Sequence, residues 1–232
     1  MGRDRHRPRR PQDTEKEMII GIEGPAGAGK STMANTVAIE LGARVIEGGA
    51  WYRALTYLAL QSGVDLQDTD ELVKLATDLD LKIIPQKGAK NRLELAGQDV
   101  TAAIYTEDVS VNVSIVAGQL PVREKIERKI VEAARVPGLS IVVGRHLRKA
   151  LPEAHILRIT ISDEEADRRH LLRSGQAAQS VQARNREDVE IGKKLGITDM
   201  DNVTLLDVSD LSETEQADAL RLFIERASTP KL

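Results

Sequence analysis

The chain has no cysteine and almost no aromatic residues. Cysteine is absent from all 232 residues, which excludes disulfide bridges, thiolate metal sites and a cysteine nucleophile. Its absence is compatible with a reducing cytoplasm, where we expect the protein to act. Aromatic residues make up only 2% of the chain, so aliphatic side chains have to fill the core. No apolar run approaches the roughly 20 residues of a membrane span, so we expect no membrane partner.

A strong charge of either sign is also missing. Charged residues make up 30% of the chain, yet the formal net charge is only −3, which argues against general electrostatic binding of nucleic acid. The hydrophobic content of 41% is that of an ordinary soluble globular protein. The length suits a single α/β core with a small insertion. Nothing in the sequence predicts whether the protein is a monomer or a homo-oligomer.

The first residues differ in composition from the rest. Within residues 1–17, five arginines are interspersed with Pro8 and Pro11, and apolar residues begin only at Met18. This composition predicts a disordered basic tail, most simply a solvated extension.

From Met18 onward, predicted strands and helices alternate. Short apolar runs predict strands at 18–22, 45–46, 139–143, 156–161 and 203–208, and helical spacing predicts helices at 30–41, 50–62, 122–134, 164–173, 181–194 and 213–226. Residues 65–108 instead contain short alternating pieces with turns at Lys87-Gly88 and Gly97-Gln98, which predict a small β-rich insert. The alternation elsewhere, over 18–64 and 109–228, predicts a mostly parallel sheet with helices on both faces.

One glycine-rich motif lies between the first predicted strand and the first predicted helix. Gly24-Pro25-Ala26-Gly27-Ala28-Gly29-Lys30-Ser31 fits the P-loop (Walker A) pattern of Gly, four residues, Gly, Lys, and Ser or Thr. Glycines let backbone N–H groups surround phosphate oxygens, and the following helix adds partial positive charge. We therefore expect ATP and Mg²⁺ as cofactors, with Lys30 on the β- and γ-phosphates and the Ser31 hydroxyl on the metal. The ATP-binding residues predicted are Gly24, Ala26, Gly27, Ala28, Gly29, Lys30, Ser31 and Thr32.

A P-loop alone does not identify the reaction. The chain has no guanine-reading Asn-Lys-x-Asp sequence, and it is too short for most motor modules. A small-molecule or nucleotide kinase of the P-loop fold is therefore the favoured class.

After residue 17, nearly the whole chain resembles bacterial cytidylate kinases. The resemblance is carried by Ile22 to Thr32, Gly49-Ala50-Trp51-Tyr52-Arg53, Gly63-Val64-Asp65-Leu66, Gly97-Gln98-Asp99-Val100-Thr101, Pro121-Val122-Arg123-Glu124, Gly144-Arg145 and Asp207-Val208-Ser209. It implies transfer of a phosphoryl group from MgATP to CMP or dCMP under a mobile lid at about 168–197. It also implies that the insert at 65–108 binds the acceptor.

The resemblance further implies roles for single residues. Arg53, Arg123, Arg145 and Arg184 match arginines that hold the acceptor nucleotide. Ser114 matches a serine that contacts the base, and Asp188 matches an aspartate that contacts the sugar. Arg168 and Arg169 fall where lid arginines meet the transferring phosphate, although an arginine on a charged helix is more often simply solvated.

The departures from the family pattern cluster on the acceptor side. Glu47-Gly48-Gly49 stands where the family has Asp-Thr-Gly or Asp-Ser-Gly, so Gly48 brings no hydroxyl to the acceptor. Val143-Gly144-Arg145-His146 replaces an acidic residue followed by Gly-Arg-Asp, and Tyr105 replaces an arginine. The lid pattern also loses its final arginine, at Ile191. A residue that recognises cytosine has to accept a hydrogen bond from the exocyclic amine of the base. His146 can accept that bond in only one of its two neutral tautomers. His146 could equally be a surface residue at a strand end.

Three functions remain open at this point. The first is a kinase for CMP or dCMP, whose anionic acceptor needs no general base. The second is a kinase of the same fold that phosphorylates a hydroxyl of a sugar, nucleoside or secondary metabolite, with Glu47 as the base or orienting group. Glu47 could instead hold a water of the magnesium ion. The third is a nucleotide-binding regulator without turnover, which would need only the P-loop.

The P-loop assignment predicts a large effect of one substitution. In Lys30→Ala the ammonium that neutralises the transferring phosphate is lost, so we expect kcat to fall by about 100-fold or more. The measurement is ADP release with MgATP and the preferred acceptor. Wild-type kcat in this variant would contradict the assignment.

Overall fold

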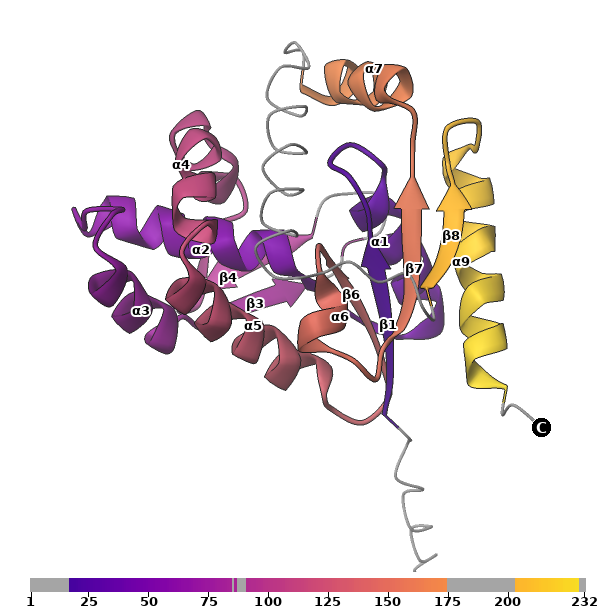
Figure 1. Cartoon of the computed structure of the whole chain (residues 1–232), viewed down its shortest axis with the longest axis horizontal. Coiled ribbons are helices and arrows are strands. Elements are labelled where there is room, and N and C mark those ends of the chain that lie inside the picture. Colours follow the sequence, from indigo (N-terminus) through magenta and orange to yellow (C-terminus); the bar gives the residue numbers. More distant parts are fainter. Residues whose placement is uncertain (1–16, 85, 87–90, 175–202, 230–232) are drawn as a thin grey trace, which may run out of the picture.

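The computed structural model describes residues 17–84, 86, 91–174 and 203–229. Its central feature is a sheet of five parallel strands in the order β2-β6-β1-β7-β8 (Figure 1). The strands are β1 (Met18–Glu23), β2 (Arg44–Glu47), β6 (Leu139–Gly144), β7 (His155–Thr160) and β8 (Val203–Asp207). The parallel sheet predicted from the alternating pattern is thereby confirmed.

Successive side chains of the strands enter two separate hydrophobic clusters, one on each face of the sheet. On one face, Ile19 and Val142 pack with α2 (Gly48–Gln61) and α5 (Leu120–Ala134). On the other face, their neighbours in the sequence, Ile20 and Ile141, pack with α1 (Lys30–Leu41) and α9 (Glu213–Ser228). This two-sided burial explains why the strands are continuous apolar runs rather than alternating ones.

The segment between residues 65 and 108 contains a second, antiparallel sheet, as predicted. It consists of β3 (Leu81–Ile84), β4 (Arg92–Leu95) and β5 (Gln98–Asp99). The same segment also holds α3 (Thr69–Asp78) and the short 3₁₀ helix η1 (Ala103–Tyr105), neither of which was predicted. The signal for α3 was present, because Asp68 caps the helix by accepting a hydrogen bond from Glu71 N at 3.0 Å.

The remaining helices are α4 (Glu107–Ala117), α6 (Leu147–Ala150) and α7 (Asp163–Ser174). The predicted helix at 181–194 and residues 1–16 of the basic tail lie outside the described residues. Within the described ranges, no helix is long and apolar enough to cross a membrane.

A buried carboxylate joins three elements at one end of the sheet. Glu23, the last residue of β1, is 4% exposed. Its Oε1 accepts a hydrogen bond from Leu147 N at 2.7 Å, at the start of α6, and its Oε2 pairs with Arg158 Nη2 of β7 at 2.7 Å. Between β6 and α6 the chain turns at His146, which has the left-handed φ of 57°. Glu23 therefore fixes the turn that carries Arg145 and His146.

Removing the partner of this carboxylate should destabilise the fold. In Arg158→Leu the Glu23 charge stays buried without its cation, and we expect the free energy of unfolding to fall by about 3 kcal/mol. Chemical denaturation measures it. The control is Arg135→Leu, which breaks the exposed 2.7 Å pair with Glu153 and should cost below about 1 kcal/mol. Equal losses in the two variants would contradict the role given to Glu23.

Candidate functional site

The glycine-rich motif forms the connection between β1 and α1, as predicted. Gly27 and Gly29 have φ angles of 85° and 86°, which favour glycine. The loop also has no room for side chains, because a Cβ at Gly24 would lie 2.5 Å from Ile159 O and one at Gly29 would lie 2.8 Å from Gln216 Oε1. The loop therefore packs closely against Ile159 of β7 and Gln216 of α9. Its shape fits a phosphate cradle opening at the N-terminus of α1.

The two motif residues expected to act on the phosphates both lie at this cradle. Lys30 Nζ donates to Gly24 O at 2.8 Å and to Pro25 O at 2.6 Å, so its ammonium lies over the loop. The Ser31 side chain hydrogen-bonds Glu47, the last residue of β2. The sequence prediction that Glu47 reaches the P-loop therefore agrees with the geometry.

Glu47 is held by more than the P-loop. Its Oε1 accepts a hydrogen bond from Asn91 Nδ2 at 2.6 Å. Burial raises the pKa of Glu47, while the hydrogen bonds from Ser31 and Asn91 and the charge of Lys30 act in the opposite direction. Sequence analysis missed Asn91, because it lies 44 residues away and in no motif.

The arrangement also suits a magnesium ion. Among the residues that the structure describes, no group of three or more His, Asp or Glu side chains could hold a metal by itself. Mg²⁺ in phosphotransferases needs only one or two protein ligands, because substrate phosphates and water complete the shell. The Ser31 hydroxyl, with Glu47 beside it, fits that requirement.

Arg53 and Tyr105 form one cluster on the acceptor side. The Arg53 guanidinium donates to Ile104 O at 3.1 Å and to Ser110 Oγ at 3.0 Å, and it lies 5.0 Å from the centre of the Tyr105 ring. Burial, and then the charge of Glu47, raise the pKa of Tyr105 to about 12. Tyr105, noted as a departure from the family, thus lies against Arg53 with its ring partly exposed to solvent.

Arg123 and His146 form a second cluster. Arg123 is 7% exposed, pairs with Glu127 Oε1 through Nε at 3.1 Å and lies 5.6 Å from the centre of the Tyr52 ring. Burial first, and then the positive charges of Arg123 and Arg145, lower the pKa of His146 to about 4. Both arginine charges therefore act on His146, which is half-buried between the end of β6 and the start of α6. Whether His146 contacts the substrate or is simply a residue at a strand end remains a prediction.

The other acceptor-side residues are less informative. Gly48 begins α2, where a Cβ would lie in ordinary contact with Val143 O of β6, at 3.4 Å, so the packing does not require glycine at this position. Ser114 is half-buried on α4. Arg184 and Asp188 lie outside the described residues, and their roles remain predictions.

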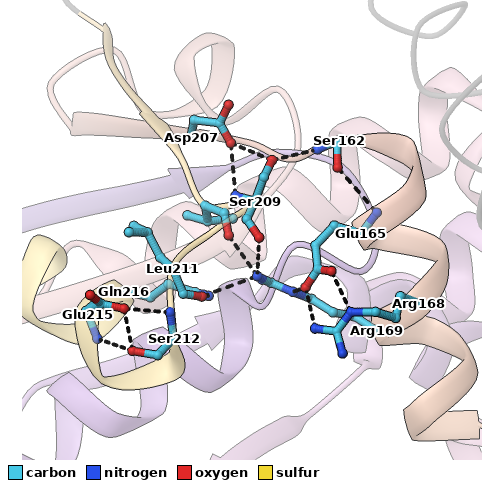
Figure 2. A network of polar contacts seen from close by, with 11 residues as sticks. Ser162, Glu165, Arg168, Arg169, Asp207, Ser209, Leu211, Ser212, Glu215 and Gln216 are labelled. Atoms are coloured by element: carbon cyan, nitrogen blue, oxygen red, sulfur yellow. Dashed lines mark hydrogen bonds and ion pairs between the residues drawn. The ribbon is translucent and has the colours of Figure 1, made fainter.

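A pocket of about 440 Å³ opens beside the P-loop, between α7 and the loop that follows β8. Figure 2 shows the polar network in its wall. Arg169 pairs with Glu165 at 2.6 Å, and its Nη2 donates to Val208 O at 2.7 Å and Leu211 O at 3.3 Å. Arg168 is exposed and pairs with the same Glu165, at 2.6 Å. Both arginines line the pocket, and their contact with a transferring phosphate remains a prediction.

Sequence analysis missed part of this wall. Gln216 and Ser212, at the start of α9, line the pocket with Gly29 and Thr32 of the P-loop. The available signal was the capping box, in which Ser212 and Glu215 bond reciprocally at the first turn. This signal marks a helix start rather than a binding site.

Taken together, the parallel sheet, the P-loop and the adjoining pocket define an ATP-dependent P-loop kinase. The family model for cytidylate kinase matches residues 20–221. The chain is 40% identical to a cytidylate kinase of Bacillus cereus (strain B4264) over 161 residues, which cover 68% of this chain and 70% of that protein. It is 37% identical to one of Bacillus thuringiensis (strain Al Hakam) over 185 residues, which cover 78% and 81%. The chain belongs to the cytidylate kinase family.

Solved structures agree with the fold. A gluconokinase from Sinorhizobium meliloti 1021 is similar with a TM-score of 0.52 and 15% identity, over 91% of this chain and 94% of that one. The protein TT1252 from Thermus thermophilus is similar with a TM-score of 0.51 and 20% identity, over 93% and 100%. At these identities the likeness supports the fold alone.

The low pKa of His146 is directly measurable. In the folded protein, the imidazole NMR signals of His146 should titrate with a midpoint near pH 4, below the ordinary value of 6.5. Because the unfolded chain takes up this proton first, His146 should stabilise the fold above about pH 6.5 and lose that contribution as the pH falls towards 4. The His146→Gln spectrum assigns the signal. A midpoint at or above 6.5 would contradict the burial and charge described here.

Proposed function

We propose that the protein transfers the γ-phosphate of MgATP to the phosphate of CMP or dCMP. The observation that carries the proposal is that two arginines lie at this edge of the sheet: Arg145, which directly follows β6, and Arg123 of α5, which is 7% exposed. Two guanidinium groups suit an acceptor that is itself an anion. Membership of the cytidylate kinase family supports the same acceptor.

The reaction depends on positioning the two phosphates and on offsetting their negative charge, more than on proton transfer. When bound, MgATP supplies the activated phosphoryl group, and the phosphate of the acceptor is already a nucleophile. Lys30 and the arginines offset the negative charge that two phosphates bring together. The Ser31 hydroxyl, held against Glu47, is placed for the metal. Arg53 lies on the acceptor side with its guanidinium fixed by Ile104 O and Ser110.

His146 supports a cytosine reader of altered chemistry. A neutral imidazole has one acceptor nitrogen and one N–H donor. The lowered pKa favours the neutral imidazole at physiological pH, and we propose that its acceptor nitrogen bonds the exocyclic amine of cytosine when CMP is bound. Ser114 on α4 is proposed as a further base contact, and Asp188 and Arg184 as sugar and phosphate contacts.

The donor nucleoside fits the pocket beside the P-loop. This pocket is bordered by Gly29 on one side and by Arg168 and Arg169 on the other. We propose that residues 168–197 act as a lid over both nucleotides and that residues 65–108 act as the acceptor-binding insert. Closure would exclude water, which otherwise competes as the acceptor and hydrolyses ATP.

A second candidate is phosphorylation of a hydroxyl, favoured by one observation. Glu47 is a carboxylate at the P-loop whose pKa burial raises, towards the range of a general base. In that case Glu47→Gln would abolish turnover of a hydroxyl acceptor. With CMP as the acceptor no proton has to be removed, so the same variant should keep measurable turnover and lose about tenfold in kcat, the part that depends on the carboxylate held beside Ser31 and Lys30.

The acceptor is decided by an assay of ADP release with MgATP against CMP, dCMP, UMP, AMP, nucleosides and amino sugars. We expect kcat/KM for CMP and dCMP to exceed that for every other acceptor by about tenfold or more, because one well-placed hydrogen bond gives that discrimination. The Lys30→Ala variant measures the background rate of ADP release. An inert CMP with a turned-over sugar would establish the second candidate instead. ATP binding without transfer to any acceptor would indicate a regulator.

A further inference from the structure

Asn91 connects the antiparallel sheet to the catalytic end of the parallel sheet. It directly precedes β4, is 4% exposed, and donates from Nδ2 to Glu47 Oε1 at 2.6 Å. Glu47 is in turn hydrogen-bonded to Ser31 of the P-loop. A chain of two side-chain contacts therefore runs from the edge of β4 to the phosphate cradle.

The environment of Asn91 shows that packing alone does not explain this residue. Its Oδ1 is buried and has no hydrogen-bond partner among the residues that the structure describes. A buried carbonyl without a partner is destabilising, and an apolar residue of similar size avoids that cost. Leu93, two residues further along, is fully buried in the core beneath the same sheet. The amide at position 91 is therefore explained by the hydrogen bond that its Nδ2 donates to Glu47.

Its bonded partner is a side chain whose orientation matters for phosphoryl transfer. Glu47 lies near the ammonium of Lys30 and near the ring of Tyr105, and it contacts the hydroxyl of Ser31. A carboxylate held at one point can rotate away from the P-loop, whereas one held by both Asn91 and Ser31 has a single orientation. Groups that act on phosphates depend on such preorganisation.

We propose that Asn91 is a positioning residue for phosphoryl transfer, which holds Glu47 towards Ser31 and Lys30 and so links the β3-β4-β5 sheet to the P-loop. The proposal rests on the proposed function in so far as transfer occurs at this P-loop, whatever the acceptor. Because Asn91 is continuous with β4, a shift of the small sheet would change the orientation of Glu47. Acceptor binding at residues 65–108 would then be communicated to the metal-binding hydroxyl.

The test replaces the amide with an apolar side chain of similar size. For Asn91→Leu we expect kcat to fall by about tenfold or more, with the KM values for ATP and acceptor within about threefold of wild type. The protein should still fold, with a modestly lower thermal midpoint, because removal of the unpartnered Oδ1 offsets part of the hydrogen bond that the Glu47 carboxylate loses. Asn91→Ala removes the same donor and replaces the leucine variant if that variant does not fold.

The control is Asn112→Leu, which should keep wild-type kcat. Asn112 Nδ2 donates to Asp108 O of its own helix at 2.9 Å.

A double variant tests whether the effect passes through Glu47. If Asn91 acts by holding this carboxylate, then adding Asn91→Leu to Glu47→Gln should change kcat by less than about twofold beyond Glu47→Gln alone. An equal loss in both backgrounds, an unchanged kcat in Asn91→Leu, or a loss of activity that only follows a loss of folding would overturn the proposal.

Different measurements test the proposed function and the role of Asn91. If wild-type protein does not phosphorylate CMP, the proposed function fails. The same variants are then compared with the acceptor that the panel identifies, or in the slow hydrolysis of ATP by water. Unchanged rates there would overturn the role of Asn91.

Discussion

The Glu23 carboxylate is the interaction on which the acceptor side of the site depends. It lies at the end of the central strand β1, buried, and it accepts hydrogen bonds from the start of α6 and from Arg158 of β7. An unpaired charge at this depth would be strongly unfavourable, so both partners must be in place. Their placement forces the turn at His146 and sets Arg145 beside the P-loop edge.

Two carboxylates at the ends of β1 and β2, on either side of β6, therefore have different tasks. Parallel strands bring their carboxyl ends to one edge of the sheet, where α/β proteins bind ligands. On β1, both oxygens of Glu23 are bonded to groups inside the fold. On β2, the Glu47 carboxylate lies near Ser31 and Lys30, and it accepts a hydrogen bond from Asn91, which directly precedes β4. The first fixes the turn that carries Arg145 and His146, and the second lies at the P-loop, where we propose that phosphoryl transfer takes place.

Local patterns were enough to predict the strands of the parallel sheet and the P-loop, whereas Glu47 was singled out by the resemblance to the family. The contacts that complete the site were beyond such patterns, because they join distant residues: Glu23 and Arg158 are 135 positions apart, and Asn91 and Glu47 are 44 apart. Helix α3 was missed although its capping signal was present, since the surrounding alternation favoured strands. The low pKa of His146 follows from its burial and from the nearby charge of Arg123. Neither the burial nor this proximity can be read from the sequence.

The central claim is that a pyrophosphate bond forms between two nucleotide phosphates at this site. Incubation with MgATP labelled at the γ-phosphate, in the presence of CMP, tests it most directly by the position of the label. The account predicts label in the β-phosphate of CDP, detected after separation of the products, and loss of that label in Lys30→Ala. Label found only in inorganic phosphate, or in an ester with a hydroxyl group, would contradict the account.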